Sequence, residues 1–313
     1  MRKTLMLVMA CALALAACGG DDAASKEVSS KDLKSLKGQP EKGGATAAER
    51  AEPAITPQER RRRAAIMLLR EKLEKVKDPD ERADLLAEVA QFGVHAKPLW
   101  SAVLAGFRDE EPFTRAVALE TAAKVDPLGC QPLLLQGLGD DESEVREMAA
   151  AAWALAGIKE LSPLLDRIEN EFEARVQFAI MVAVEAVGEK HHVPLVAKVV
   201  GDLDPSALKP TIRFLGKHGA KDHAGTIVDC LEKDDVDLRI LAARTLKALG
   251  VKAKPILSGL ASALLDDEPG VREAAVNALK SLTGQDLGYD SSADEDTRSK
   301  ARAAWVEWIS RNT

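Results

Sequence analysis

Carboxylates and arginines, whose side chains could form ion pairs, recur along the chain at a regular spacing. The stretches DDESEVRE (140–147) and DDEPGVRE (266–273) repeat nearly the same eight residues. Aligned on these stretches, arginines recur about every 31 to 33 residues, at Arg82, Arg115, Arg146, Arg239 and Arg272. Acidic residues precede each Val-type position by five residues, at Asp109, Asp140, Glu171, Asp202 and Asp266. Gln177 and Leu208 occupy the arginine position in two further units and interrupt the series.

Histidines are the second group that could carry chemistry. His191, His192, His218 and His223 lie near the expected turns of adjacent units, and His191 and His223 occupy equivalent positions. Stacked helices lie about 8–10 Å apart, so equivalent imidazoles could share an ion only through side-chain adjustment. No Cys or carboxylate completes a recognisable ligand set. We expect solvated turn residues, with a metal site at His191, His192 and His223 as the alternative.

Motifs for catalysis are missing from the sequence. It contains no phosphate-binding glycine loop, no HExxH, no GxSxG and no Cys–His arrangement suited to a nucleophile. Cys130 and Cys230 lie about three repeats, or roughly 30 Å, apart, whereas a disulfide needs Cα atoms within about 7 Å. We therefore expect two free, packed thiols and a protein that is not an enzyme and needs no cofactor.

The elements that must position these residues are helices in pairs. Repeats of this period indicate a solenoid. In the stretch DVDLRILAARTLKALG (235–250), apolar residues follow helical i, i+3, i+4 spacing and Gly250 ends the helix. A second helix then begins near Pro255, in a Pro-aliphatic pattern that recurs at Pro98-Leu99, Pro132-Leu133, Pro163-Leu164, Pro194-Leu195 and Pro255-Ile256. Neither helix can bury its apolar stripe alone, so successive pairs must stack.

Composition supports an all-α chain. Hydrophobic residues make up 46% of the sequence but aromatic residues only 4%, and Ala and Leu, which favour helices, supply most of the apolar content. The formal net charge is −7. This acidic balance argues against nucleic-acid binding, which needs a basic footprint.

Residues 78–283 resemble the HEAT repeats, in the short bacterial form called HEAT-like or PBS-lyase-like. The matching residues are the acidic start of each unit, the pairs Val145-Arg146 and Val271-Arg272 with the alanines that follow, and the ending Leu249-Gly250. The resemblance implies an α-solenoid superhelix of about seven two-helix repeats. It also implies that the repeated acids and arginines form a ladder between neighbouring repeats. Tetratricopeptide repeats fit less well, because their period is 34 and their Trp, Gly and Tyr positions are absent.

The N-terminus predicts export. Met1 to Lys3 is followed by 13 apolar residues from Leu5 to Ala17, a length typical of a signal peptide and too short for an ordinary membrane-spanning helix. The sequence Leu15-Ala16-Ala17-Cys18 resembles the lipobox of bacterial lipoproteins, which implies that residues 1–17 are removed and that Cys18 is acylated. An ordinary secretory signal cut after Ala17 is the alternative. By the same resemblance, Gly19 favours a periplasm-facing place on the outer membrane.

A tether and two capping segments complete the domain prediction. Residues 18–56 contain almost no large apolar side chains after Cys18, so we expect a disordered tether. Residues 57–77 follow a capping-box pattern and should form an N-terminal capping helix. Residues 284–313 should form a loop and a C-terminal capping helix, with Trp305 and Trp308 closing the end of the core. An aromatic ligand site at this tryptophan pair is the alternative.

The predicted function is a membrane-anchored scaffold, because solenoids offer long concave binding surfaces. Its partner would be another envelope protein, its anchor the acylated Cys18 in the bilayer, and its state monomeric. Trp100, on an expected second helix, is the candidate for partner binding. One alternative is a lyase or chaperone acting on a cofactor-bearing protein. The other is a peripheral protein that binds anionic surfaces through Arg60–Arg63, although a solvated helix face explains these arginines as well.

Overall fold

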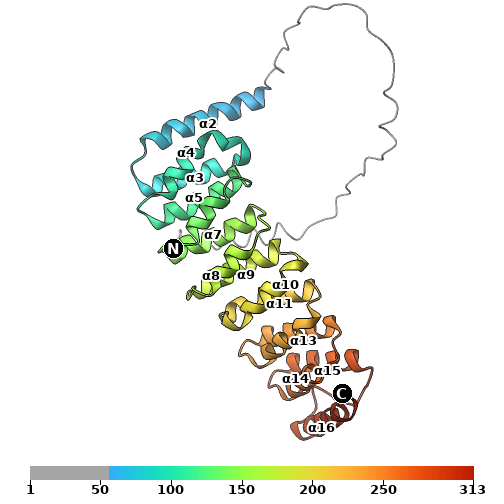
Figure 1. Cartoon of the computed structure of the whole chain (residues 1–313). Coiled ribbons are helices and arrows are strands. Elements are labelled where there is room, and N and C mark those ends of the chain that lie inside the picture. The colour runs from blue at the N-terminus through green and yellow to red at the C-terminus, as the bar shows by residue number, and fades with distance from the viewer. Residues whose placement is uncertain (1–55) are drawn as a thin grey trace, which may run out of the picture. The chain divides into compact units, whose positions relative to one another are not determined.

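The computed structural model describes residues 56–313, which form helices joined by short turns and include no strand (Figure 1). The predictions for the signal peptide, Cys18 and most of the tether fall outside the described residues. The described residues fall into two units, which divide between Glu71 and Lys72. No helix in the described part combines the length and the apolar character needed to cross a bilayer.

Helix α2 (Pro57–Lys75) begins at the predicted capping position. The Glu59 N–H donates a hydrogen bond to Thr56 Oγ1 at 3.2 Å, which satisfies one of the free donors of the first turn. Ile66 and Leu69 are the buried residues of this helix. The role of α2 as a cap of the repeats stays a prediction.

Residues 72–313 confirm the predicted all-α, HEAT-like solenoid, since first helices alternate with shorter second-helix segments along the unit (Figure 1). The first helices are α3 (Pro79–Ala90), α5 (Pro112–Val125), α7 (Ser143–Leu155), α9 (Ala174–Val187), α11 (Pro205–Lys217), α13 (Val236–Leu249) and α15 (Pro269–Thr283). The second-helix segments are built on α4 (Trp100–Phe107), α6 (Gln131–Gly137), α8 (Ser162–Ile168), α10 (Val193–Val199), α12 (Ala224–Val228) and α14 (Lys254–Ser262), and the longer helix α16 (Glu295–Asn312) follows α15.

The core runs continuously between the stacked pairs. Each first helix packs on the first helix of the next unit, from α3 on α5 to α13 on α15. Small residues also let the second-helix segments pack closely on the first helices. Gly106 in α4 and Gly137 in α6 occupy equivalent positions, and a Cβ there would lie 2.4 Å from Leu86 Cδ1 and 2.7 Å from Leu119 Cδ1, respectively. Trp153 fills one core position with a fully buried indole, whose Nε1–H donates to the Glu160 carbonyl at 2.9 Å.

Glycines end the first helices for different reasons. Gly250 follows α13 with a φ of 72° and closes the helix through its N–H bond to the Leu246 carbonyl, in the left-handed conformation that glycine adopts at no steric cost. Gly188 follows α9 in an extended conformation. Glycine is required there because a Cβ would lie 2.6 Å from the Phe214 ring.

The second-helix segments are less regular than the sequence pattern predicts. Several include 3₁₀ turns: η1 (Gly93–Leu99), η2 (Lys190–His192), η3 (Val200–Asp202), η4 (Lys221–His223), η5 (Asp229–Glu232) and η6 (Ala263–Leu265). At the Pro194-Leu195 position of the repeated pattern, Leu195 is 44% exposed while Val193 and Val196 are buried. A 3₁₀ helix has about 3.0 residues per turn instead of 3.6. The 3₁₀ turns on either side of α10 therefore change the direction in which its side chains face, which explains the exposure of Leu195.

The last helix, α16, packs on α14 and on η6. Trp305 is fully buried and Trp308 lies edge-on to it, with the ring centroids 6.4 Å apart. The preceding loop is held by Tyr289, whose hydroxyl donates to the Leu264 carbonyl. This placement favours a structural role for the tryptophan pair over an aromatic ligand site.

Candidate functional site

The repeated carboxylates and arginines meet where one repeat joins the next. We call the connections between each second-helix segment and the following first helix the joint segments: residues 108–111, 138–142, 169–173, 202–204, 233–235 and 266–268. Each begins with or contains the predicted acidic position, and the arginine position lies in the first turn of the next first helix. The joint segments therefore carry the ladder predicted from the sequence.

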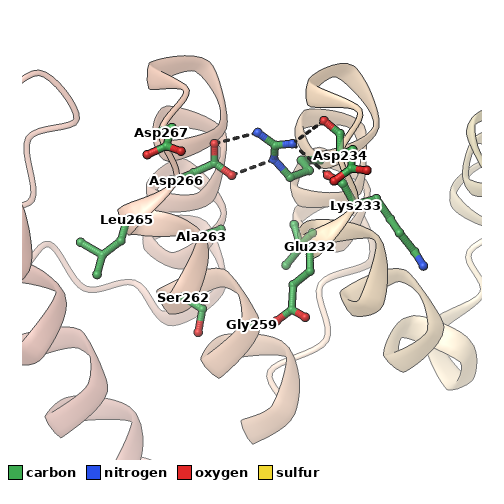
Figure 2. A pocket seen from close by; sticks show the side chains of 11 residues that line it. Glu232, Lys233, Asp234, Gly259, Ser262, Ala263, Leu265, Asp266 and Asp267 are labelled. Atoms are coloured by element: carbon green, nitrogen blue, oxygen red, sulfur yellow. Dashed lines mark hydrogen bonds and ion pairs between the residues drawn. The ribbon is translucent and has the colours of Figure 1, made fainter. Parts of the chain in front are cut away.

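Each complete rung ties one joint segment to the next. Arg115 donates to the two carboxylate oxygens of Asp140 at 2.9 and 2.7 Å, and its Nη1 donates to the backbone carbonyls of Asp109 and Glu110. Arg239 repeats this arrangement with Asp266, at 2.7 and 2.9 Å, and with two carbonyls of its own joint segment (Figure 2). Two parallel bonds between guanidinium and carboxylate fix the orientation as well as the distance.

The remaining arginines form rungs of the same kind. Arg82 pairs with Asp109, and Arg146 pairs with Glu171 at 2.7 and 3.0 Å. Arg272 has no following repeat and donates instead to the Ser291 carbonyl at 3.0 Å, in the loop before α16. Every predicted ladder arginine is thus engaged, and each of the four that pair with an acid contacts the acid of the next repeat.

Burial and pairing oppose each other in the pKa values of these groups. Burial alone would raise the pKa of the Glu171 carboxyl, but the hydrogen bonds from Arg146, the Glu173 N–H and Arg167 together outweigh burial, and the pKa lies below its ordinary value. The same balance lowers the pKa of Asp140 beside Arg115. These carboxylates are therefore charged at neutral pH, and each rung is an ion pair.

The fourth joint, between α9 and α11, has a neutral rung. Gln177 is buried, donates from Nε2 to the Glu171 carbonyl at 2.6 Å and accepts the Asp204 N–H at 2.6 Å. The amide therefore still bridges the two joint segments, so the prediction that Gln177 breaks the ladder is wrong for the backbone contacts. Asp202, predicted as the acid of this rung, is exposed and takes no part in it.

At the fifth joint, between α11 and α13, both members of the rung change together. Leu208 is buried at the arginine position, and Lys233 stands in the position of the acid. The neighbouring residue Lys209 supplies a displaced ion pair with Asp235, at 2.8 Å. The predicted interruption at Leu208 is therefore real, but a surface pair one residue away crosses the same joint.

Open grooves accompany two of the joints. A groove of about 440 Å³ at the sixth joint is lined by Arg239, Asp266 and the ends of the adjacent second-helix segments (Figure 2). A larger groove of about 660 Å³ lies at the fourth joint, between residues 169–172 and 202–204. The fourth joint is the one where glutamine replaces arginine at the ladder position.

The joint segments present mostly negative charge to solvent. Their exposed acidic residues include Glu110, Glu111, Asp141, Glu142, Glu173, Asp234, Asp235, Asp267 and Glu268. Within these segments the exposed basic residues are Arg108 and Lys233. Because the arginines of the rungs are bound in internal ion pairs, the surface of the joint segments suits a positively charged partner.

Phe172 is the feature of this surface that the sequence analysis missed. Its side chain is 91% exposed and lines the groove at the fourth joint. The residue after the ladder acid is acidic in most other joint segments, as in Asp141, Asp234 and Asp267. A comparison of the repeats at this one position could have singled out Phe172.

The histidines do not all lie in solvated turns as predicted. His191 is exposed, whereas His192 is 5% exposed and its Nδ1 accepts the Glu189 N–H at 3.1 Å. His218 stacks near Phe214, with ring centroids 4.6 Å apart, and its Nε2 is buried without a hydrogen-bond partner. The prediction is wrong for His192 because its ring packs under the 3₁₀ turn that it ends.

Other reactive side chains in the described part are poorly placed for chemistry. Cys130 and Cys230 are free and buried, as the spacing predicts, and burial raises the pKa of both thiols to about 11. Among residues 56–313, no group of three or more His, Cys, Asp or Glu side chains is arranged to hold a metal ion.

The two further surface candidates differ in how much they expose. Trp100 begins α4 and is half-buried, so part of its ring is available to a partner. In the arginine run, Arg62 and Arg63 both pair with Glu59, at 3.1 Å each, while Arg60 and Arg61 are exposed. The run therefore offers less free positive charge than its sequence suggests.

Comparison with known proteins gives similarity of structure alone. No family model and no curated protein matches the sequence. The structure is similar to the complex of CpcE and CpcF of phycocyanin lyase from a Nostoc species, at 18% identity and a TM-score of 0.42, over 78% of this chain and 100% of that chain. It is also similar to an engineered protein, at 17% identity and a TM-score of 0.46, over 59% and 99% of the two chains. Human deoxyhypusine hydroxylase matches at 18% identity and a TM-score of 0.33, over 75% and 93%.

Removing the most buried rung should destabilise the stack of repeats. Arg146→Ala leaves Glu171 charged and nearly inaccessible, with Arg167 as its remaining partner at 3.1 Å. We expect a loss of about 3 kcal/mol in the free energy of unfolding, measured by urea denaturation at pH 7. Arg213→Ala removes a similar pair with Glu185 that is solvent-exposed, and should cost only about 0.2–1 kcal/mol. Equal losses in the two variants would contradict the structural role of the buried rung.

Stability should also fall as the pH drops below about 6.5. Burial lowers the pKa of His192 and of His218, with added repulsion from His191 and from Lys217, respectively. A histidine whose pKa is lowered by folding binds its proton more readily when unfolded, so stability is full above the unfolded pKa and declines below it. Thermal unfolding between pH 8 and pH 5 measures this decline.

A matched pair of variants assigns the histidine effect. In His192→Asn the amide oxygen can accept the Glu189 N–H in place of Nδ1, and the decline should become shallower. His223→Gln removes a histidine on η4 that is not fully buried and should leave the profile unchanged. An unaltered profile in His192→Asn would show that this buried ring does not cause the decline.

Proposed function

We propose that this chain is a lipid-anchored, non-catalytic adaptor that holds another protein of the cell envelope on its repeat surface. The observation that carries the proposal is the series of joint segments, which present exposed carboxylates along the repeats and open grooves at the fourth and sixth joints. A helical-repeat scaffold of this kind places equivalent surface positions at regular intervals. Such spacing suits an extended partner better than a small substrate.

The character of the surface supports binding over catalysis. The grooves at the fourth and sixth joints are open, and charged and polar side chains line them together with apolar ones. Small-molecule sites are more often enclosed and mainly apolar. The buried thiols of Cys130 and Cys230 have raised pKa values, which leaves little thiolate at neutral pH for nucleophilic chemistry.

Trp100 supports a contact surface that extends onto the second-helix segments. It is the large aromatic residue at the solvent-facing start of α4, and exposed aliphatic residues occur on other second-helix segments, at Leu135 in α6 and Leu195 in α10. Aromatic anchors surrounded by polar residues are typical of energetically important contacts. The proposed contact surface therefore combines these apolar positions with the acidic joint segments.

The anchored location rests on the sequence of the first 18 residues. A short apolar run ending in Leu-Ala-Ala-Cys supports export and acylation of Cys18, with the outer membrane as the proposed site. A diacylated cysteine with a further acyl chain provides stable attachment, because more than one chain is buried in the bilayer.

Replacing the acylated residue should release the protein. In Cys18→Ser the thiol needed for acylation is absent, so the chain should no longer incorporate radiolabelled palmitate and should leave the membrane fraction. Fractionation of the native cell envelope after expression of both forms makes the comparison. Cys130→Ser alters a thiol that is buried in the repeats and should stay in the membrane fraction. Membrane attachment of Cys18→Ser would show that another feature anchors the chain.

Capture of a partner should depend on Trp100. We expect the tagged full chain, solubilised from native envelope, to retain one dominant protein, and Trp100→Ala to reduce that protein at least about fivefold. Leu155→Ala, at an exposed position on α7, is the matched control and should retain it. Equal capture by all three chains would show that Trp100 does not contribute to partner binding. Capture of nothing at low and moderate salt would count against the adaptor.

A further inference from the structure

We propose that the groove at the fourth joint receives an arginine side chain from the partner protein, beside Gln177, at the joint where the ladder acid has no ladder arginine. The inference deepens the proposed adaptor function and rests on it, because it assigns the partner's chemistry and its point of entry. The groove is lined by Glu169, Glu171, Phe172, Gln177, Gly201, Asp202 and Asp204, with Ile168 and Leu203.

The other joints show what completes this position. At four of them the acid equivalent to Asp202 is bound by a guanidinium from the preceding repeat, as Asp140 is by Arg115 and Asp266 by Arg239. At the fourth joint the side chain equivalent to the ladder arginine is Gln177, which is shorter and uncharged. Its amide forms hydrogen bonds with the backbone of Glu171 and Asp204. Asp202 is exposed and has no bond to a neighbouring side chain among the described residues. The repeat therefore keeps the acid of the rung but lacks its cation.

The space and the charge of the groove match such a cation. Its volume of about 660 Å³ exceeds the 440 Å³ of the sixth-joint groove, which Arg239 helps to line. No Lys, Arg or His lines the larger groove. The other carboxylates already have partners: Glu171 pairs with Arg146, Glu169 lies 3.6 Å from Lys198, and Asp204 accepts from Ser206. Asp202 is the carboxylate left for an incoming charge.

Phe172 selects the kind of cation. Its phenyl ring is 91% exposed on the groove wall, at a position that is acidic in most other joint segments. A planar guanidinium can stack on an aromatic face while donating two bonds to a carboxylate, and a lysine ammonium cannot do both in this way. The pair of Asp202 and Phe172 therefore favours arginine over lysine, and the acidic joint segments on either side favour a basic stretch around that arginine.

The test is a selection of peptides against the purified full chain in detergent. A displayed library of random nine-residue peptides is selected in parallel on the native chain and on Gln177→Arg. In this variant a new internal arginine can pair with Asp202 and occupy the groove. We expect arginine to be enriched at least about fivefold among peptides retained by the native chain relative to those retained by Gln177→Arg. Equal arginine frequencies in the two pools would overturn the proposal.

Point variants keep the test decisive if Gln177→Arg does not fold. The affinity of the best recovered peptide, followed by fluorescence anisotropy, should fall about tenfold in Asp202→Asn and about fivefold in Phe172→Ala. Replacing the peptide's arginine with citrulline should have an equal or larger effect. Asp267→Asn removes the same charge from an exposed position at the sixth joint, where Arg239 already fills the rung, and should bind as the native chain does. Equal losses of affinity in Asp202→Asn and Asp267→Asn would show that the peptide responds only to the overall negative charge, and would overturn the proposed site.

Two further results separate this proposal from the adaptor function. If Gln177→Arg still captures the envelope partner in full, the adaptor stands and the arginine site is wrong. If Asp202-dependent peptide binding occurs but no envelope protein is captured, the site stands and the adaptor is wrong. Sedimentation equilibrium of the native chain and Gln177→Arg tests whether the groove binds an arginine from a second copy of this chain. A dimer that is lost in the variant would show that it does, and would overturn the proposed partner.

Discussion

Every helix pair in residues 72–313 has two apolar faces that only the neighbouring pairs can cover. This constraint sets the small size of the residues at the contacts, such as Gly106 and Gly137, and the continuity of the core from α3 to α16. Apolar contact is not directional, so it does not by itself determine how one pair is oriented on the next. The rungs between joint segments supply that direction.

A rung works as a connector because one guanidinium binds two segments at once. Arg115 and Arg239 each hold two carbonyls of their own joint segment and the carboxylate of the next. The desolvated pair of Arg146 and Glu171 adds orientation more than net stability, since burying both charges offsets much of their attraction. The use of all the ladder arginines inside the protein is also the reason that the surface of this edge is acidic.

The fourth and fifth joints depart from this scheme in opposite ways. At the fifth, the acid and the arginine are both replaced, so the rung contains no carboxylate that needs a cation. At the fourth, the cation alone is replaced, and Asp202 remains beside an exposed aromatic ring. A change that replaces both members leaves no unpaired acid, whereas one that keeps the acid leaves a carboxylate able to bind a cation. The interruption of the repeat pattern is thus the place where function is to be sought.

The sequence alone determined the all-α fold, the period of the repeats, the identity of the ladder residues and the separation of the two thiols, because helical periodicity and repeat spacing are local or regular properties. It could not determine that Gln177 still bridges two segments, that Leu195 is exposed, or that His192 is buried. Those outcomes depend on how a 3₁₀ turn rotates a helix and on which backbone groups a neighbouring repeat presents. The groove that Phe172 and Asp202 share exists only once two joint segments, thirty residues apart, are packed side by side.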